Sequence, residues 1–417
     1  MARRALLDEI GDGRGVDEAA LGFIAALAHQ CFINEYVFFC DEAEMGQAAK
    51  LRDAMAAALD LSAPVPVWHL LAVASYFPLE TISGADRLLD MTWPEPVAVL
   101  LAQQLCEPRE EARLRAAIPK ATRIENAVSR LNQQQYEENP YPRWVRIPCA
   151  DQAITIAAYL RKRFPLACFE PKGESDVAYI LSAGCGTGQL ALEITQGIRS
   201  RTLAVDLSTA SLGYAKRKAL ELGLSGIEFA QADLLELGVL GRTFDVIECS
   251  GVLHHLADAF VGWKALLPLL RPGGFMTVGL YSEAARKGIA AAQHFVTQGG
   301  YGTSMDGIRR CRQDLLNSPA CQDFGVAASD DFFGVSSCRD LLFHVQESRT
   351  QLPAIDTFLR ENGLIFLGFE TDPGTLKAYR QRFPEDSAAT NLRFWHIFEE
   401  ENPSAFSGMY RFWIQKA

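Results

Sequence analysis

A glycine-rich turn between two apolar segments is the part of the sequence with the clearest chemical signature. Residues 179–206 read YILSAGCGTGQLALEITQGIRSRTLAVD. This pattern predicts a buried strand, a tight turn, a short helix and a second strand that ends in Asp206. Glycines let the backbone approach a ligand closely, and an acid about twenty residues later can accept hydrogen bonds from ribose hydroxyls. We therefore expect this βαβ unit to bind an adenosine-containing molecule.

The spacing of the glycines separates two classes of ligand. A dinucleotide-binding turn has the pattern G-x-G-x-x-G. Here Gly184, Gly186 and Gly188 form G-x-G-x-G, and Gln189 stands where a third dinucleotide glycine would fall. The loop AGCGTGQ resembles the cofactor loop of class I S-adenosylmethionine (SAM) methyltransferases. A Rossmann-like unit that binds another nucleotide is the alternative.

Three downstream segments resemble the same family in order and spacing. GIEFAQADLLEL is similar to the third strand and its exit near Asp233, and TFDVIECSGVLHHL is similar to the fourth strand and its exit. LLRPGGFMTVGLYS is similar to a helix end, a Pro-Gly-Gly turn and the fifth strand. The resemblance covers residues 179–282. Residues 363–370 and 408–416, rich in aromatic and β-branched residues, match the sixth and seventh strands, the seventh antiparallel beside the fifth.

The resemblance implies an α/β fold, with a seven-stranded, Rossmann-like class I methyltransferase sheet, and it implies SAM as the cofactor. It also implies that Asp206 accepts hydrogen bonds from the ribose and that Asp233 holds the adenine amino group. We expect no metal, because no Cys-x-x-Cys pair or zinc-like spacing occurs. The residues expected to bind the cofactor are Tyr141, Gly184, Cys185, Gly186, Gly188, Asp206, Leu207, Asp233, Leu234 and Ser250.

One position departs from the pattern of the family. Class I methyltransferases usually carry an acid two positions before the first glycine of the loop, and this chain has Ser182 there. In the family that acid helps to hold the amino group of the cofactor. Another group must therefore take over this role, or the cofactor binds more weakly.

The composition of the chain limits which classes of protein and which binding partners are plausible. The chain has 417 residues and a net charge of −11, which disfavours nucleic acid because phosphate binding needs a basic face. No apolar run has the length to span a bilayer, and no apolar stretch follows the basic N-terminal residues as in a secretory signal. Ten scattered cysteines read as reduced thiols. We expect a cytoplasmic protein that does not bind membranes, with a homodimer possible.

The domain organisation follows from changes in periodicity along the chain. We predict an all-α N-terminal domain, in which Asn34, Glu35 and Tyr36 lie within the first long helix, and a helical cap inserted after the fifth strand. Because the cap leaves from the carboxyl end of a strand, we expect it on the substrate side. The predicted ranges are 1–122 for the N-terminal domain, 123–175 for a connector and lid, 176–282 for the SAM-binding core, 283–351 for the cap and 352–417 for the rest of the sheet.

The connector carries a proline-containing segment, Asn139-Pro-Tyr-Pro, which favours a stiff, extended conformation. Segments just ahead of the first strand often cover the cofactor in the family. Four residues are therefore candidates for an active-site lid, with interdomain packing as the alternative: Tyr136, Asn139, Tyr141 and Trp144.

Catalytic candidates must lie at strand ends or on the cap, because SAM supplies the reactive methyl group and the protein supplies alignment and, where the acceptor needs one, a base. His254 and His255 follow the fourth strand, and Tyr281 ends the fifth. Either histidine is a candidate base, and Tyr281 is a candidate contact of the acceptor. We include His254 and Tyr281 among the catalytic candidates, with packing beside the cofactor as the alternative.

His344 and Glu347 stand three residues apart, so they share one face if their segment is helical. The pair resembles a His-Glu pair of bacterial protein lysine methyltransferases, and we include both residues among the catalytic candidates. A satisfied polar pair at a domain contact is the alternative.

Three functions are compatible with these features. The first is a SAM-dependent methyltransferase that modifies a peptide or protein side chain. The second is a small-molecule O- or N-methyltransferase in which the helical elements only enclose the pocket. The third is a SAM-binding regulatory protein without catalysis, which the missing acid at Ser182 favours.

Overall fold

The computed structural model describes residues 2–12, 18–150, 152–170 and 176–417. The predicted domain ranges also run through residues 1, 13–17, 151 and 171–175, which lie outside the described residues. The chain divides into two compact units. The sheet unit consists of Leu114–Ala291 and His344–Ala417, and the helical unit consists of Met1–Arg113 and Ala292–Phe343.

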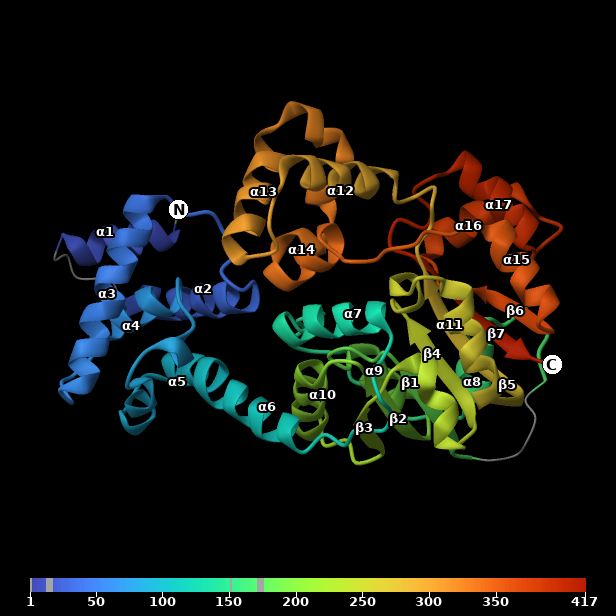
Figure 1. The fold of residues 1–417 in the computed structure, drawn as a ribbon, viewed down its shortest axis with the longest axis horizontal. Coiled ribbons are helices and arrows are strands. Elements are labelled where there is room, and N and C mark those ends of the chain that lie inside the picture. Colours follow the sequence, from blue (N-terminus) through green and yellow to red (C-terminus); the bar gives the residue numbers. More distant parts are fainter. Residues whose placement is uncertain (1, 13–17, 151, 171–175) are drawn as a thin grey trace. The chain divides into compact units, whose positions relative to one another are not determined.

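The sheet unit is built on a seven-stranded sheet with the order β3-β2-β1-β4-β5-β7-β6 (Figure 1). Strands β1 to β5 are parallel, and β7 pairs antiparallel with both β5 and β6. This confirms the predicted class I methyltransferase fold and the antiparallel seventh strand. The strands are β1 (Ala178–Ala183), β2 (Ser200–Asp206), β3 (Ile227–Gln231), β4 (Phe244–Ser250), β5 (Leu270–Leu280), β6 (Leu364–Phe369) and β7 (Tyr410–Lys416).

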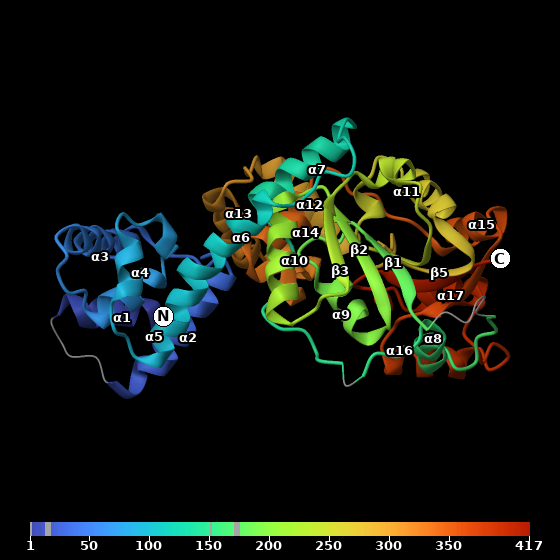
Figure 2. The same cartoon turned by 90° about the horizontal axis from the view of Figure 1, so that it is seen from below.

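Apolar side chains on both faces of the sheet explain why its strands read as continuous hydrophobic runs. One face packs against α11, α15 and α17 around Trp263 and Trp395, and the other packs against α8 and α9 around Leu160 and Ile194 (Figure 2). The helices of this unit are α7 (Ala127–Glu138), α8 (Ile156–Arg163), α9 (Gln189–Gly197), α10 (Thr209–Glu221), α11 (Ala259–Leu266), α15 (Leu352–Glu361), α16 (Pro373–Arg382) and α17 (Leu392–Glu401).

The helical unit joins the N-terminal helices to most of the insertion that follows β5. Its N-terminal helices surround a core formed by apolar residues such as Leu70, Leu71 and Leu100. The unit contains, in whole or in part, α1 (Ala2–Gly11), α2 (Leu21–Ile33), α3 (Glu42–Asp60), α4 (Val67–Ala74), α5 (Glu95–Leu101), α6 (Glu107–Ala116), α12 (Lys287–Gly299), α13 (Met305–Asn317) and α14 (Val335–Leu342).

A turn after α2 ties the N-terminal helices to the insertion. Glu35 and Tyr36 both have positive φ, 54° and 55°, so the helix ends at Ile33, and the prediction that these residues lie inside it was wrong. The Glu35 carboxylate accepts hydrogen bonds from the backbone N–H and hydroxyl of Ser336, both at 2.5 Å. Arg312 donates to the carbonyl of Val37 at 2.9 Å. Polar groups of the insertion therefore hold this turn.

The insertion is largely helical between α12 and α14, but its compact unit is shared with the N-terminal helices. The predicted domain boundaries, including a cap over residues 283–351, stay a prediction. Of the helices within the described ranges, none combines the length and the apolar character needed to cross a bilayer.

Candidate cofactor pocket and active site

A cavity of about 320 Å³ opens at the carboxyl ends of β1, β2, β3 and β4. This is the edge at which open α/β sheets bind their ligands. Nine of the ten residues predicted to bind the cofactor line it: Tyr141, Gly184, Cys185, Gly186, Asp206, Leu207, Asp233, Leu234 and Ser250. The sheet topology brings them together because each follows or ends one of these neighbouring strands, except Tyr141 in the connector.

The glycine turn between β1 and α9 needs its glycines for two different reasons. At Gly186, with φ of 52°, a Cβ would lie 2.7 Å from the carbonyl oxygen of Tyr141, so only glycine lets the connector pass so close. Gly188, the predicted residue that does not line the cavity, caps α9, where a Cβ would lie 2.7 Å from the Cβ of Ala215. Gly188 therefore sets the packing of α9 against α10.

Asp206 ends β2 and is fixed by the turn that it faces. Its two carboxylate oxygens accept hydrogen bonds from the backbone N–H groups of Gly186 and Ser208, each at 2.8 Å. Burial raises the pKa of Asp206 to about 6, although these backbone hydrogen bonds oppose the rise. The side chain is thus preorganised to accept hydrogen bonds from a diol in the cavity.

Asp233 is the buried acid at the end of β3, with 1% of its surface exposed. Its Oδ1 accepts a hydrogen bond from the backbone N–H of Leu235 at 3.0 Å, whereas Oδ2 has no partner among the described residues. A buried acceptor without a donor is costly, and an exocyclic amino group in the cavity would satisfy it. The residues of the cavity therefore fit the adenosine part of SAM.

Replacing Asp233 with Asn should lower the affinity for S-adenosylhomocysteine (SAH) about 10- to 100-fold, because an amide N–H would face the adenine amino group. Calorimetry measures this loss. Glu236→Gln, an exposed change three residues away, is the control. The inosine analogue of SAH carries an acceptor in place of that amino group, so Asp233→Asn should bind it more tightly than wild type does. Equal affinity of both proteins for both ligands would exclude an adenine contact.

Helix α7, from the predicted connector, provides one wall of the cavity. Ser129, Asn132 and Tyr136 line the cavity from one face of the helix. Asn132 donates to the carbonyl of His255 at 2.9 Å, and Glu137 accepts from the backbone N–H of Thr209 at 2.7 Å, at the start of α10. The helix is therefore anchored at both the β4 exit and the α10 N-terminus.

The four lid candidates divide between the two roles that the sequence left open. Tyr136 and Tyr141 line the cavity. Trp144 is buried in an apolar cluster and donates from its indole nitrogen to the carbonyl of Thr187 at 3.2 Å. Asn139 does not line the cavity; it follows the last residue of α7.

The two histidines after β4 have different surroundings. His254 has 1% of its surface exposed, stacks on the ring of Tyr281 at 3.7 Å and does not line the cavity. His255 does line it. Burial lowers the pKa of His254 well below its usual value and that of His255 to about 4, so both imidazoles are neutral near pH 7. Of the two histidines that sequence analysis considered, His255, which was not among the selected catalytic candidates, is the one that lines the cavity.

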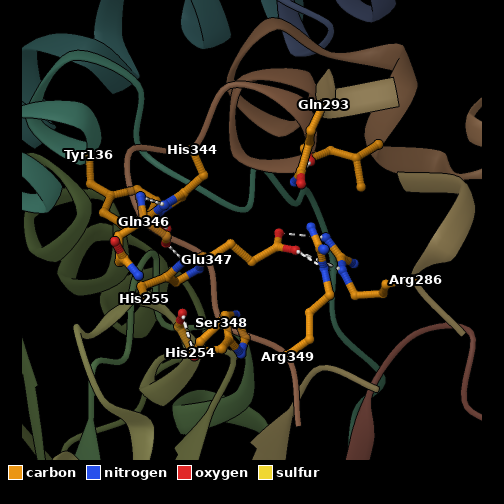
Figure 3. A network of polar contacts seen from close by, with 11 residues as sticks. Tyr136, His254, His255, Arg286, Gln293, His344, Gln346, Glu347, Ser348 and Arg349 are labelled. Atoms are coloured by element: carbon orange, nitrogen blue, oxygen red, sulfur yellow. Dashed lines mark hydrogen bonds and ion pairs between the residues drawn. The ribbon is translucent and has the colours of Figure 1, made fainter. Parts of the chain in front are cut away.

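The backbone of Gln346 fixes the tautomers of two stacked histidines. Its carbonyl oxygen lies 3.1 Å from Nδ1 of His255, so this nitrogen carries a hydrogen and donates it. Its backbone N–H donates to Nδ1 of His344 at 3.1 Å, so Nε2 of a neutral His344 carries the hydrogen and donates to the Tyr136 hydroxyl at 3.0 Å (Figure 3). The imidazole rings stack at 3.6 Å. Nε2 of His255 consequently holds a lone pair, and the hydroxyl of Tyr136 is oriented.

The segment that carries His344 and Glu347 is not helical, so the condition for a shared helix face is not met. Helix α14 ends at Leu342, and the chain then crosses the strand ends, where Ser348 donates to the carbonyl of His254 at 2.7 Å and Thr350 to that of Tyr281 at 2.9 Å. These backbone contacts take the donors that a helix would have used internally.

Glu347 belongs to a buried ion-pair network. It binds Arg286 at 2.8 Å and Arg349 at 3.1 Å (Figure 3). The guanidinium of Arg286 also lies 3.5 Å from the centre of the Tyr281 ring. Glu347, Tyr281 and His344 do not line the cavity. Breaking such a buried pair by removing one partner is costly, so these contacts stabilise the strand ends. Catalytic roles for His254, Tyr281, His344 and Glu347 stay predictions.

Three charged residues of the cavity were missed by sequence reasoning, and the first of them is Glu193 on α9. Glu248 lies within β4, and Arg411 lies in β7 with its guanidinium 2.7 Å from Glu370. An acid inside the apolar run VIECS was the available signal for Glu248, because buried acids in a strand are rarely without a role. No local pattern distinguishes Arg411 from other strand arginines.

Comparison with known proteins adds a family match and two curated relatives. Residues 180–274 match the model of a family described as a methyltransferase domain. An uncharacterized protein of Synechococcus sp. is 32% identical over 240 residues, which cover 53% of this chain and 57% of that protein. A ubiquinone biosynthesis O-methyltransferase of Idiomarina loihiensis is 32% identical over 118 residues, which cover 28% of this chain and 48% of that enzyme. The chain thus spans about half the length of these relatives.

Solved structures include more distant similarities. PKMT2 from Rickettsia typhi is 17% identical, with 64% of this chain and 54% of that chain covered and a TM-score of 0.49. Magnesium protoporphyrin IX methyltransferase from Synechocystis PCC 6803, solved with bound SAH, is 14% identical, with 76% and 97% covered and a TM-score of 0.34. The match over residues 180–274, together with the strand order and the pocket at the strand ends, identifies a class I SAM-dependent methyltransferase domain in this chain.

Proposed function

We propose that the protein transfers the methyl group of SAM to a nucleophilic side chain of a peptide or protein. The observation that carries the methyl-transfer part is the single cavity in which the glycine turn, Asp206, Asp233 and His255 meet. SAM, when bound, supplies an electrophilic methyl group, and the remaining work is alignment and proton removal. Asp206 and Asp233 orient the adenosine part.

In this proposal His255 removes the proton of the acceptor. Its neutral ring and the hydrogen bond from Nδ1 to Gln346 leave the Nε2 lone pair as the basic site, and its side chain lines the cavity. The Tyr136 hydroxyl, oriented by His344, would position the acceptor atom from the α7 wall. The base role thus moves from His254 to His255.

A peptide or protein acceptor is supported by the helical unit. This unit contributes no strand to the sheet, and it is held together by contacts such as that of Glu35 with Ser336 between segments far apart in sequence. We infer that a separate unit of this kind serves to recognise a large acceptor. A small-molecule O- or N-acceptor is the second candidate, and the relative from Idiomarina loihiensis, named as an O-methyltransferase, favours it.

The proposed location of the protein is the cytoplasm.

Incubating the purified protein with SAM labelled on the methyl group, together with extract from the source cells, separates these acceptors. We expect label in the macromolecular fraction, with a 14-Da increment on a peptide by mass spectrometry. Asp206→Ala, which should bind SAM poorly, is the background control. Label confined to the small-molecule fraction would mean that the acceptor is a small molecule and not a protein. Label no higher than in the Asp206→Ala control would contradict methyl transfer.

A further inference from the structure

Ser182 and Glu248 lie opposite each other on the neighbouring strands β1 and β4. They are register partners between β1 and β4, and the Ser182 hydroxyl donates a hydrogen bond to Oε2 of Glu248. Oε1 of Glu248 accepts from the backbone N–H of Ser250 at 2.8 Å. Each carboxylate oxygen has two lone pairs, so the group can accept further donors. The side chain lines the cavity together with Gly184 and Ser250.

The position of Glu248 is unfavourable for a carboxylate without a cationic partner. Only 2% of its surface is exposed, and burial raises its pKa to about 7 although the hydrogen bonds from Ser182 and Ser250 and the charge of Arg411 oppose the rise. The pocket-lining cation, Arg411, is paired with Glu370 at 2.7 Å. A second cation arriving in the cavity would therefore be stabilised by Glu248 and would hold it in the ionised form.

SAM brings such a cation on its amino-acid part. Four acids line the cavity: Glu193, Asp206, Asp233 and Glu248. Asp206 is oriented for the ribose and Asp233 has the acceptor oxygen for the adenine. Glu193 is half-buried on α9 and contacts Gln189 on the same helix at 3.4 Å. Glu248 is the buried acid beside the glycine turn and is one strand away from the position of the missing family acid.

We propose that Glu248, oriented by Ser182, binds the α-ammonium group of SAM and replaces the acid that class I methyltransferases usually carry at the position of Ser182. The carboxylate is supplied from β4 in place of β1, and the serine keeps the hydrogen bond that fixes it. This inference rests on the proposed use of SAM, so its test compares a ligand with the amino-acid part and one without it.

Calorimetry with SAH and with 5′-methylthioadenosine, which lacks the amino-acid part, tests the assignment. Glu248→Gln should lower SAH affinity about 10- to 100-fold and leave methylthioadenosine affinity within about twofold of wild type. Glu236→Gln, an exposed change at a residue that does not line the cavity, should leave the affinity for both ligands unchanged. Adding Ser182→Asp to Glu248→Gln should restore part of the SAH affinity, because the carboxylate returns from the neighbouring strand.

The pH dependence gives a second readout. Because the pKa of Glu248 lies at about 7, SAH binding must expel a proton at pH 6, and wild-type affinity should rise between pH 6 and 7.5. Part of this rise should be specific to SAH and absent with methylthioadenosine. The Glu248→Gln variant should lose that SAH-specific part. Other charged or titratable groups near Glu248 also affect the pH dependence, and comparing SAH with methylthioadenosine removes their shared contribution. These groups are Cys185, Glu193, Asp206, Cys249, Glu370 and Arg411.

Two results would overturn the proposal. Equal losses of SAH and methylthioadenosine affinity in Glu248→Gln would make Glu248 a structural acid, and an unchanged SAH affinity would remove it from the binding site. If wild type bound neither ligand, the use of SAM itself would fail, which the comparison of the two ligands distinguishes from a misplaced ammonium contact.

Discussion

Asp206→Ala should weaken SAH binding about 10- to 100-fold, because it removes a carboxylate that accepts charge-assisted hydrogen bonds from the ribose. The variant also deprives the backbone N–H groups of Gly186 and Ser208 of their acceptor, so the glycine turn loses part of its preorganisation. Both effects have the same sign. Calorimetry at pH 7.5 measures the change.

The matched control is Glu228→Ala, which removes an exposed carboxylate from the adjacent strand β3 and should leave SAH affinity unchanged. The ribose contact favours ionised Asp206, whose pKa is raised to about 6, so wild-type affinity for methylthioadenosine should fall as pH drops through 6. If Asp206→Ala bound SAH with wild-type affinity, Asp206 would not belong to the cofactor-binding site.

His255→Asn should lower the turnover of the identified acceptor about 10²- to 10⁴-fold, which is the usual contribution of a general base. Asparagine can keep a donor towards the carbonyl of Gln346 while it lacks the Nε2 lone pair, so the variant separates basicity from positioning. SAH affinity should remain near wild type, and single-turnover kinetics would show the loss in the chemical step.

The pH profile and a second variant sharpen this result. Because the pKa of His255 is about 4, the base is neutral from about pH 5 upwards, and the rate should not rise through 6.5 as it would with an ordinary histidine. His254→Gln is a change beside the Tyr281 ring and away from the cavity. It should lower the melting temperature of the protein and leave its turnover close to that of wild type. Full activity of His255→Asn would remove the base role from this residue.

The fold was predictable because its signals are local. Each strand is an apolar run bounded by turn residues, and the glycine turn, Asp206 and Asp233 stand at strand ends whose order the family resemblance supplies. Parallel strands place their carboxyl ends at one edge, so residues distant in sequence converge without any further information.

The rest of the site depends on contacts that no local pattern encodes. Glu248 meets Ser182 across a strand pair, and the tautomers of His255 and His344 are set by the peptide of residue 346, about ninety residues after His255. Helical spacing misled at His344 because its segment gives its backbone donors to the strand ends instead. The same limit applies to Glu35, whose turn is held by Ser336.

The most direct test of the central claim is a calorimetric titration of the wild-type protein with SAH, in parallel with NAD and ATP. The cavity at the ends of β1 to β4 should bind one SAH per chain and neither of the other nucleotides, because the glycine spacing, Asp206, Asp233 and Glu248 match the cofactor of a methyltransferase. Stoichiometric binding of NAD or ATP without binding of SAH would contradict the assignment of this pocket.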